Sequence, residues 1–206
     1  NTGTISWNKV SSDSNNGKKL SGSEWKLTKT KNFGWNATTG KAEYADIASD
    51  QQKPIAITDC VPAENKAAAE TTCSAPAGAA EGRPYDVDPA AGQFKLTGLE
   101  WGTYTLVETK APDGYDVDST VRTFTFGPTA DTDGTGTWKS NSVESKTGDT
   151  TGAFTTSDVE YDSSVFTFSV NGIKNKPGVI LPGTGGVGDY WIYAAALVAA
   201  LIGVVA

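Results

Sequence analysis

The sequence predicts an all-β fold, an antiparallel β-sandwich that carries long loop insertions. Residues 1–177 contain no extended stretch with the 3.6-residue apolar period of a helix, and instead show short segments of alternating apolar and polar residues. Gly, Asn, Asp and Pro separate these segments, as turns require. With 206 residues, 37% of them hydrophobic, the chain can build a core and differs from a disordered chain.

The strands follow in order from this alternation. Ile5, Trp7 and Lys9 share one face of a first strand, which the turn-forming residues 11–17 end. Trp25 and Leu27 open a second strand. The remaining strands are predicted around Phe94 and Leu96, around Tyr104, Leu106 and Glu108, over 121–126, and over 165–170.

Two insertions interrupt the strands. The first covers residues 31–92, and we expect it to contain a strand fragment at 55–57 and a short helix in the Ala-rich stretch 63–72. The second covers 129–158 and is rich in Gly, Thr and Ser, with Trp138 as its expected anchor.

The composition excludes several classes of activity. The chain has no histidine, which rules out Ser-His-Asp and Cys-His catalysis and histidine-bound zinc; we predict no metal site and no cofactor. A net charge of -7 without a basic cluster argues against nucleic acid as a partner. Carboxylate pairs such as Asp86/Asp88 and Asp116/Asp118 lie in Gly/Pro-rich turns without a recognisable cleft, so we do not expect a glycosidase or any other turnover enzyme.

The C-terminal residues predict a membrane segment at 190–206. Residues 191–206 are uninterrupted apolar residues and would reach about 24 Å as a helix, slightly less than a hydrocarbon core of roughly 30 Å. Tyr190, Trp191 and Tyr193 suit a membrane interface. The alternative is a buried helix, which the lack of any polar face disfavours. Because the sequence has no initial Met and no signal peptide, we expect it to be part of a longer or processed chain.

A Pro/Gly-rich linker over 178–189 precedes this segment and contains a specific motif: Leu181, Pro182, Gly183, Thr184 and Gly185. Placed before a terminal apolar segment, the motif resembles the LPxTG sorting signal of Gram-positive cell-wall proteins. The resemblance implies that a sortase cysteine cleaves between Thr184 and Gly185. Thr184 would then be joined to a peptidoglycan precursor or to a lysine of another pilin. The protein would be secreted, held in the membrane only before sorting, and displayed at the cell wall.

Cys60 and Cys73 flank the Ala-rich stretch. An even number of cysteines in a secreted chain favours a disulfide, which would stabilise the fold by about 3 kcal/mol through the unfolded state. The alternative is two buried thiols. Since the spacing is not CxxC, a redox role is less expected.

Lys9 and Glu108 occupy strand positions where the alternation predicts core. Taken alone, this pattern favours a lysine that extends from its strand end to solvent and a glutamate that pairs with this lysine or with solvent. The surrounding sequence offers a second interpretation.

Residues 98–115, GLEWGTYTLVETKAPDGY, closely resemble the E-box region of SpaA-type (CNA-B, prealbumin-like) pilin domains. Residues 20–27 and 3–10 resemble the family's early segments, and 173–177 resemble its last strand. The resemblance implies an Ig-like, prealbumin-like sandwich over 1–177. It does not extend to the two insertions.

The resemblance also implies an isopeptide bond between Lys9 of the first strand and Asn175 of the last, promoted by Glu108. An apolar site disfavours the charged forms of both Lys9 and Glu108, so that a neutral amine can attack the Asn175 carboxamide. Protonated Glu108 would donate to the developing oxyanion and transfer protons as ammonia leaves. Each molecule reacts once, on itself.

The acceptor position depends on the strand phase. Phe166, Phe168 and Val170 place the even-numbered residues of the strand on the inner face. Asn175 has an odd number, so the same alternation would place it on the outer face. A bulge at Gly172 would reset the phase and keep Asn175 as acceptor. A turn at Asn171-Gly172 would instead leave Asn171 as the second choice.

Two functions therefore remain in view. The first is a structural pilus (fimbrial) subunit anchored or polymerised by sortase. The second is an adhesin that binds a host matrix protein or glycan through its insertions, with Trp35, Tyr44, Tyr85 and Trp138 as contact aromatics. Packing of the insertions onto the sandwich is the alternative use of these rings.

Overall fold

The structure is a computed structural model that describes residues 2–13, 17–126, 159–162 and 167–178. The sorting motif at 181–185, the apolar segment 190–206 and the second insertion at 129–158, with Trp138, lie outside these ranges. Within the described ranges, no helix has the length and apolar character needed to cross a membrane.

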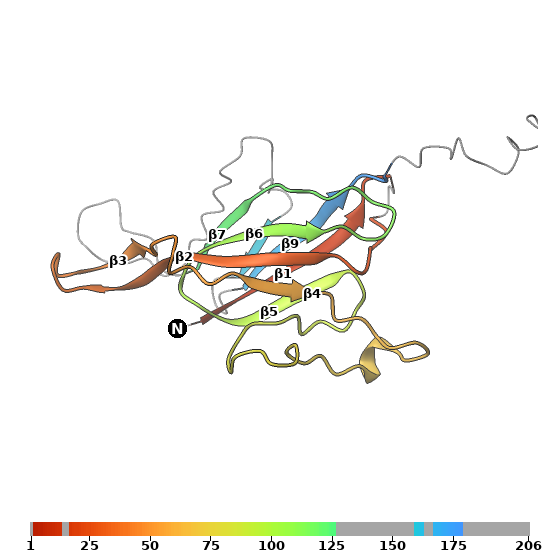
Figure 1. The fold of residues 1–206 in the computed structure, drawn as a ribbon, viewed down its shortest axis with the longest axis horizontal. Coiled ribbons are helices and arrows are strands. Elements are labelled where there is room, and N and C mark those ends of the chain that lie inside the picture. The colour runs from red at the N-terminus through yellow and green to blue at the C-terminus, as the bar shows by residue number, and fades with distance from the viewer. Residues whose placement is uncertain (1, 14–16, 127–158, 163–166, 179–206) are drawn as a thin grey trace, which may run out of the picture.

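Two β-sheets form the fold, as predicted (Figure 1). The first sheet has the order β5-β1-β9-β8, made of Gln93–Glu100, Thr2–Ser11, Thr167–Asn175 and Val159–Asp162. The second has the order β3-β2-β6-β7, made of Lys41–Asp46, Glu24–Asn36, Gly102–Lys110 and Arg122–Phe126, with β4 (Ile55–Thr58) also paired to β2.

The first and last strands are neighbours. β1 and β9 run parallel, whereas the other described strand pairs are antiparallel. Parallel neighbours cannot be joined by a tight turn, and here most of the sandwich lies between them in sequence. The two ends of the domain therefore meet side by side in one sheet.

The core lies between the two sheets and is built from the alternating residues of the predicted strands. Its centre is an aromatic group in which the Trp7 and Phe94 rings stack at 4.8 Å and Trp25 meets Trp7 edge-on at 5.5 Å. Such pairs add to the stabilisation from buried area. The fully buried side chains around them are Ile5, Leu27, Ile57, Leu96, Leu106 and Phe124.

The first insertion is more ordered than its sequence suggests. β2 continues to Asn36 and forms a hairpin with β3 that extends beyond the sandwich (Figure 1). The predicted strand fragment at 55–57 is present as β4. The predicted helix at 63–72 is reduced to a 3₁₀ turn, Ala68–Glu70, with no buried residue and no side-chain cap to hold a longer helix.

The chain between β4 and β5 is fastened by a disulfide and by two carboxylates. The predicted Cys60–Cys73 disulfide is present, with a Cα–Cα distance of 5.8 Å. Asp86, which is 3% exposed, accepts hydrogen bonds from the backbone N–H groups of Cys60, Asp88 and Lys95. Asp59 accepts from Gly22 and Gly92. Irregular chain is thereby tied to the sandwich at several points.

Candidate functional site

Lys9 lies on the inner face of β1, as the alternation with Ile5 and Trp7 predicts. Its side chain is fully buried, and its Nζ lies 5.2 Å from the centre of the Trp25 ring. Hydrogen bonds of 2.8 Å from the Lys9 N–H to Gly92 and from the Leu20 N–H to Lys9 fix the backbone on both sides. The lysine therefore does not extend to solvent.

Glu108 lies on the inner face of β6 and is 2% exposed. Its Oε1 is 3.0 Å from Lys9 Nζ, an ion pair in which both side chains are fully buried. Its Oε2 accepts hydrogen bonds from the Asp118 N–H at 2.7 Å and from Asn175 Nδ2 at 2.9 Å. One carboxyl group thus contacts Lys9 with one oxygen and Asn175 with the other.

A bulge in β9 brings Asn175 to this point. Val170 pairs with Trp7 and Ile173 with Lys9, so β9 has one more residue than β1 in this interval. Gly172 lies at the bulge with φ +79° and an ideal Cβ there would be 3.4 Å from Val10, so glycine suits the position. The predicted reset of phase is correct, and the alternative turn at 171–172 is wrong because β9 continues to Asn175.

The Asn175 amide is held in one orientation. Its Nδ2 donates to Glu108 and, at 3.0 Å, to the backbone oxygen of Asp116. A backbone carbonyl can only accept, so the amide nitrogen and not Oδ1 faces Asp116. Oδ1 accepts no hydrogen bond from any described residue. The side chain of Asn171 is not among those the structure describes.

The segment after β6 closes over the cluster. Residues 111–118, which follow β6 and include the end of the E-box-like stretch, pair with the end of β9: Asp116 donates its N–H to the Lys176 carbonyl, and Gly178 donates to the Gly114 carbonyl. Tyr115 and Pro177 form an isolated β-bridge. The loop therefore covers Asn175 while supplying backbone partners to Asn175 and Glu108.

Burial sets the electrostatics of the cluster. Loss of hydration lowers the pKa of Lys9, although the negative charges of Glu108 and Asp118 oppose the shift; the positive charge of Arg122 lowers it further. Burial raises the pKa of Asp118, but hydrogen bonds from Thr120 and Arg122 and the Arg122 charge outweigh burial and hold it below its ordinary value.

The other carboxylates considered from the sequence have structural partners. Asp86 and Asp118 hold backbone N–H groups and Arg122, respectively, and Asp88 caps the Ala90 N–H at 2.9 Å. Asp116 is exposed and joins the cluster only through its backbone. No group of three Cys, Asp or Glu within the described ranges could hold a metal ion.

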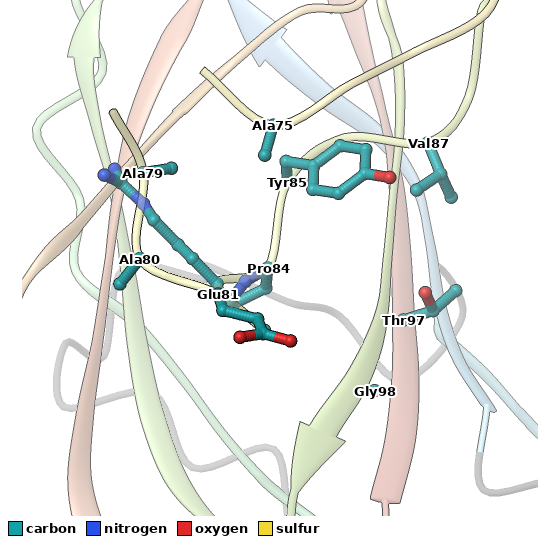
Figure 2. A pocket seen from close by; sticks show the side chains of 11 residues that line it. Ala75, Ala79, Ala80, Glu81, Pro84, Tyr85, Val87, Thr97 and Gly98 are labelled. Carbon is teal, nitrogen blue, oxygen red and sulfur yellow. The ribbon is translucent and has the colours of Figure 1, made fainter. Parts of the chain in front are cut away.

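A shallow groove of about 320 Å³ lies between the first insertion and β5 (Figure 2). Ala75, Tyr85 and Val87 line one part of it, with Thr97 and Gly98 from β5 opposite. None of the residues of the buried cluster lines this groove. Tyr85, one of the contact aromatics proposed from the sequence, is half-buried here.

With the fold and the cluster described, comparison with known proteins identifies the family. The model of the SpaA prealbumin-like fold domain matches residues 3–142, and the chain belongs to this family. The matched range contains Lys9 and Glu108, whereas Asn175 follows it. Comparison with curated proteins gave no match.

Three solved structures illustrate the structural similarity. The group B streptococcus pilus 2b backbone protein is 20% identical, with 88% of this chain and 43% of that chain covered and a TM-score of 0.36. GBS52, the minor pilin of Streptococcus agalactiae, is 17% identical, with 90% and 48% covered and a TM-score of 0.38. The major pilin SpaD of Corynebacterium diphtheriae is 15% identical, with 86% and 32% covered and a TM-score of 0.37. The chain spans less than half the length of each.

The structure thus brings together the three side chains predicted from the sequence and adds three groups that were not predicted. These are the Asp116 carbonyl, the Asp118 N–H and the Arg122–Asp118 ion pair. Backbone groups carry no residue-type signal. Arg122, however, lies two residues before the buried Phe124 on the same strand. Alternation alone would therefore have placed the Arg122 side chain on the core face.

Proposed function

We propose that this chain is part of a structural surface protein of a Gram-positive bacterium, a pilus subunit that is stabilised by an autocatalytic isopeptide bond between Lys9 and Asn175. The observation that carries the proposal is Glu108, whose two oxygens contact the Lys9 amine and the Asn175 amide nitrogen in a buried site. Membership of the SpaA family supports the same interpretation, and the similar structures include proteins described as backbone, minor and major pilins.

The geometry supports a proton path through one carboxyl group. Glu108 Oε1 takes a proton from Lys9 Nζ, which leaves a neutral amine, as burial favours. The amine attacks the Asn175 side-chain carbonyl carbon to form a C–N bond. The bond to Nδ2 then breaks as the attacking nitrogen gives up its second proton to Glu108. Both protons pass through the carboxyl group to the leaving nitrogen on the Oε2 side, which departs as ammonium. Lys9 and Asn175 end as a secondary amide, and Glu108 can return to its starting state.

Positioning supplies the reactivity that an amide lacks. The Asp116 carbonyl and Glu108 hold Nδ2, and the Asp118 N–H holds Glu108, so the leaving nitrogen faces its proton donor before reaction. The sequence predicts that Glu108 also donates a hydrogen bond to the oxyanion. Its contact is with the nitrogen instead, and we therefore assign it proton transfer between the two nitrogens.

The position of the bond suits a load-bearing protein. It would tie β1 to β9, the strand that leads to the sorting motif at 181–185. Sortase would join Thr184 to a peptidoglycan precursor or to a lysine of another subunit, and the apolar segment would hold the precursor in the membrane until then. Force applied along the chain would pass through the bond and would not separate the two strands.

Intact-mass measurement tests the isopeptide bond. The folded 206-residue chain should weigh one ammonia less than its sequence after reduction, and digestion should give a peptide in which Lys9 is joined to Asn175. Lys9→Ala, Glu108→Gln and Asn175→Ala should each restore the sequence mass. Lys26→Ala, an exposed lysine on β2, is the matched control and should keep the loss. A wild-type mass equal to the sequence mass would refute the bond.

The sortase step needs its own experiment. Incubation of the chain with sortase and an oligoglycine amine should yield a product in which Thr184 carries the amine. Thr184→Ala should give none. If neither an active anchoring sortase nor an active polymerising sortase changes the wild-type chain, the proposed sortase step is contradicted. The isopeptide proposal is not affected.

One observation favours the adhesin as a second function. Trp35 is 71% exposed on the β2–β3 hairpin beyond the sandwich, whereas the Tyr44 ring packs on Phe33 at 4.8 Å. Binding to matrix proteins and to a panel of glycans, compared between the wild type and Trp35→Ala, tests this function. Equal binding, or none, would remove Trp35 from consideration.

A further inference from the structure

The Arg122–Asp118 ion pair adjoins the candidate site, and the two charges have no role in the proposed reaction so far. Arg122 is 5% exposed, and its Nη2 lies 2.5 Å from Asp118 Oδ2. Burial of the Arg122 guanidinium costs desolvation, which the partly exposed Asp118 offsets only in part, and a hydrophobic residue of similar volume often stabilises a core equally well. The stability of the sandwich alone therefore does not explain why an arginine occupies this position.

The strand register places Arg122 next to the reaction. On the antiparallel β6–β7 pair, Arg122 lies directly opposite Leu106, so both side chains share the inner face. Glu108 lies two residues further along the same face of β6. Arg122 Nη1 also donates to the Thr120 carbonyl at 3.3 Å.

Asp118 connects Arg122 to Glu108. Its carboxylate accepts from Arg122 and from the Thr120 N–H at 3.0 Å, while its own N–H donates to Glu108 Oε2. One residue thus fixes the orientation of Glu108 through its backbone and holds the arginine through its side chain.

We propose, on the basis of the proposed function, that Arg122 and Asp118 are positioning residues that set how readily Lys9 loses its proton before it attacks Asn175. The charged groups that act electrostatically on Lys9 are Glu108 on β6, whose Oε1 contacts the amine, Asp118 on the loop after β6, and Arg122 on β7. The uncharged Trp25 ring of β2 also lies beside the amine, and the Asn175 amide of β9 contacts the other oxygen of Glu108. Asp118 favours the protonated amine, and Arg122 opposes this effect.

Opposite charges predict opposite effects on the reaction. Arg122→Gln leaves the negative charge of Asp118 uncompensated, which favours the protonated amine. The profile of reaction rate against pH should therefore move to higher pH than in the wild type. Asp118→Asn removes a negative charge that favours the protonated amine, so the pH profile of the rate should move to lower pH. A unit charge several ångströms away in a partly buried site shifts such a profile on the order of one pH unit, which changes the rate about tenfold at a fixed pH below the midpoint.

The rate is measured on the full chain. Unfolded, reduced chain is diluted into buffers from about pH 5 to about pH 9, quenched with guanidinium and reductant at intervals, and weighed for loss of ammonia. Rates are normalised to the folded fraction given by tryptophan fluorescence. Arg122→Lys should return the profile toward that of the wild type, and Arg83→Gln, a change in the arginine that binds the Ala56 carbonyl, should leave it unchanged.

A second measurement does not need the reaction. The Asn175→Ala chain cannot form the bond, so the pKa of the Lys9 amine can be measured in it by NMR titration. This pKa should rise with Arg122→Gln and fall with Asp118→Asn. Shifts of the same sign, or profiles equal to that of the wild type, overturn the inference. A wild-type chain that never loses ammonia refutes the proposed function itself, whereas the titration still decides the roles of Arg122 and Asp118.

Discussion

Asp86 and Glu108 are both buried carboxylates, but their surroundings differ. Asp86 accepts three backbone N–H groups from the chain around β4 and β5. Glu108 contacts two reactive side chains, Lys9 and Asn175, and among the described residues accepts one backbone N–H, that of Asp118. Backbone donors do not react, so Asp86 serves to fasten irregular chain. The partners of Glu108 can exchange protons with it, and this difference separates a structural carboxylate from a candidate for catalysis.

The largest expected effect comes from removal of Lys9. Lys9→Met loses the proposed covalent tie between β1 and β9, so the free energy of unfolding should fall by about 5 kcal/mol. Guanidinium unfolding of the wild type and the variant measures it. Lys26→Met, a change at an exposed lysine on β2, is the control and should leave the free energy of unfolding nearly unchanged. A difference below about 1 kcal/mol would contradict a cross-linked wild type.

The disulfide provides the matching test in the region around Asp86. It closes a loop with a sequence separation of only 13, so replacing Cys60 and Cys73 by serine should cost about 3 kcal/mol. Hydrogen exchange should accelerate mainly between residues 59 and 86, with β1 and β9 still protected. Loss of protection throughout the sandwich would mean that the two regions do not unfold independently.

Asp86 itself should make stability depend on pH. Burial raises its pKa to about 6 from the ordinary 3.8, so the folded chain binds this proton more tightly than the unfolded chain. The associated stability is therefore present at low pH and is lost as pH rises from about 4 to about 6, by about 2–3 kcal/mol. Asp86→Asn should remove this dependence. Midpoints of urea unfolding measured across the interval check it, and a wild type whose stability rises with pH there would show the opposite sign.

The sequence predicted those parts of the molecule in which side chains alternate. Ile5, Trp7 and Lys9 on β1, and Tyr104, Leu106 and Glu108 on β6, lie on the predicted inner faces because a strand turns every second residue inward. The sequence could not decide between a bulge at Gly172 and a turn at 171–172, because both structures use a glycine at positive φ. β8 and β3 were not predicted, because short edge strands pair on one side and carry little pattern.

The three side chains of the candidate site could be predicted because a family resemblance pointed to polar residues in apolar positions. The Asp116 and Asp118 backbone partners could not, since any residue supplies the same carbonyl or N–H group. Trp35 shows the converse limit. Its ring looks like a core residue in sequence, yet β2 extends beyond the sandwich and leaves it 71% exposed, a consequence of strand length that residue type does not encode.

The smallest expected effect on stability is at Trp35, and it sharpens the contrast within β2. Trp25 and Trp35 lie on the same strand, but Trp25 is fully buried against Trp7 and Phe94. Trp25→Ala should cost about 3–5 kcal/mol, because it removes a large core side chain. Trp35→Ala should change stability by no more than about 0.5 kcal/mol, as is usual for exposed positions. Thermal unfolding of the two variants measures both. A large loss for Trp35→Ala would mean that the hairpin packs against another part of the protein in solution, and its aromatic ring would then belong to the core and not to a binding surface.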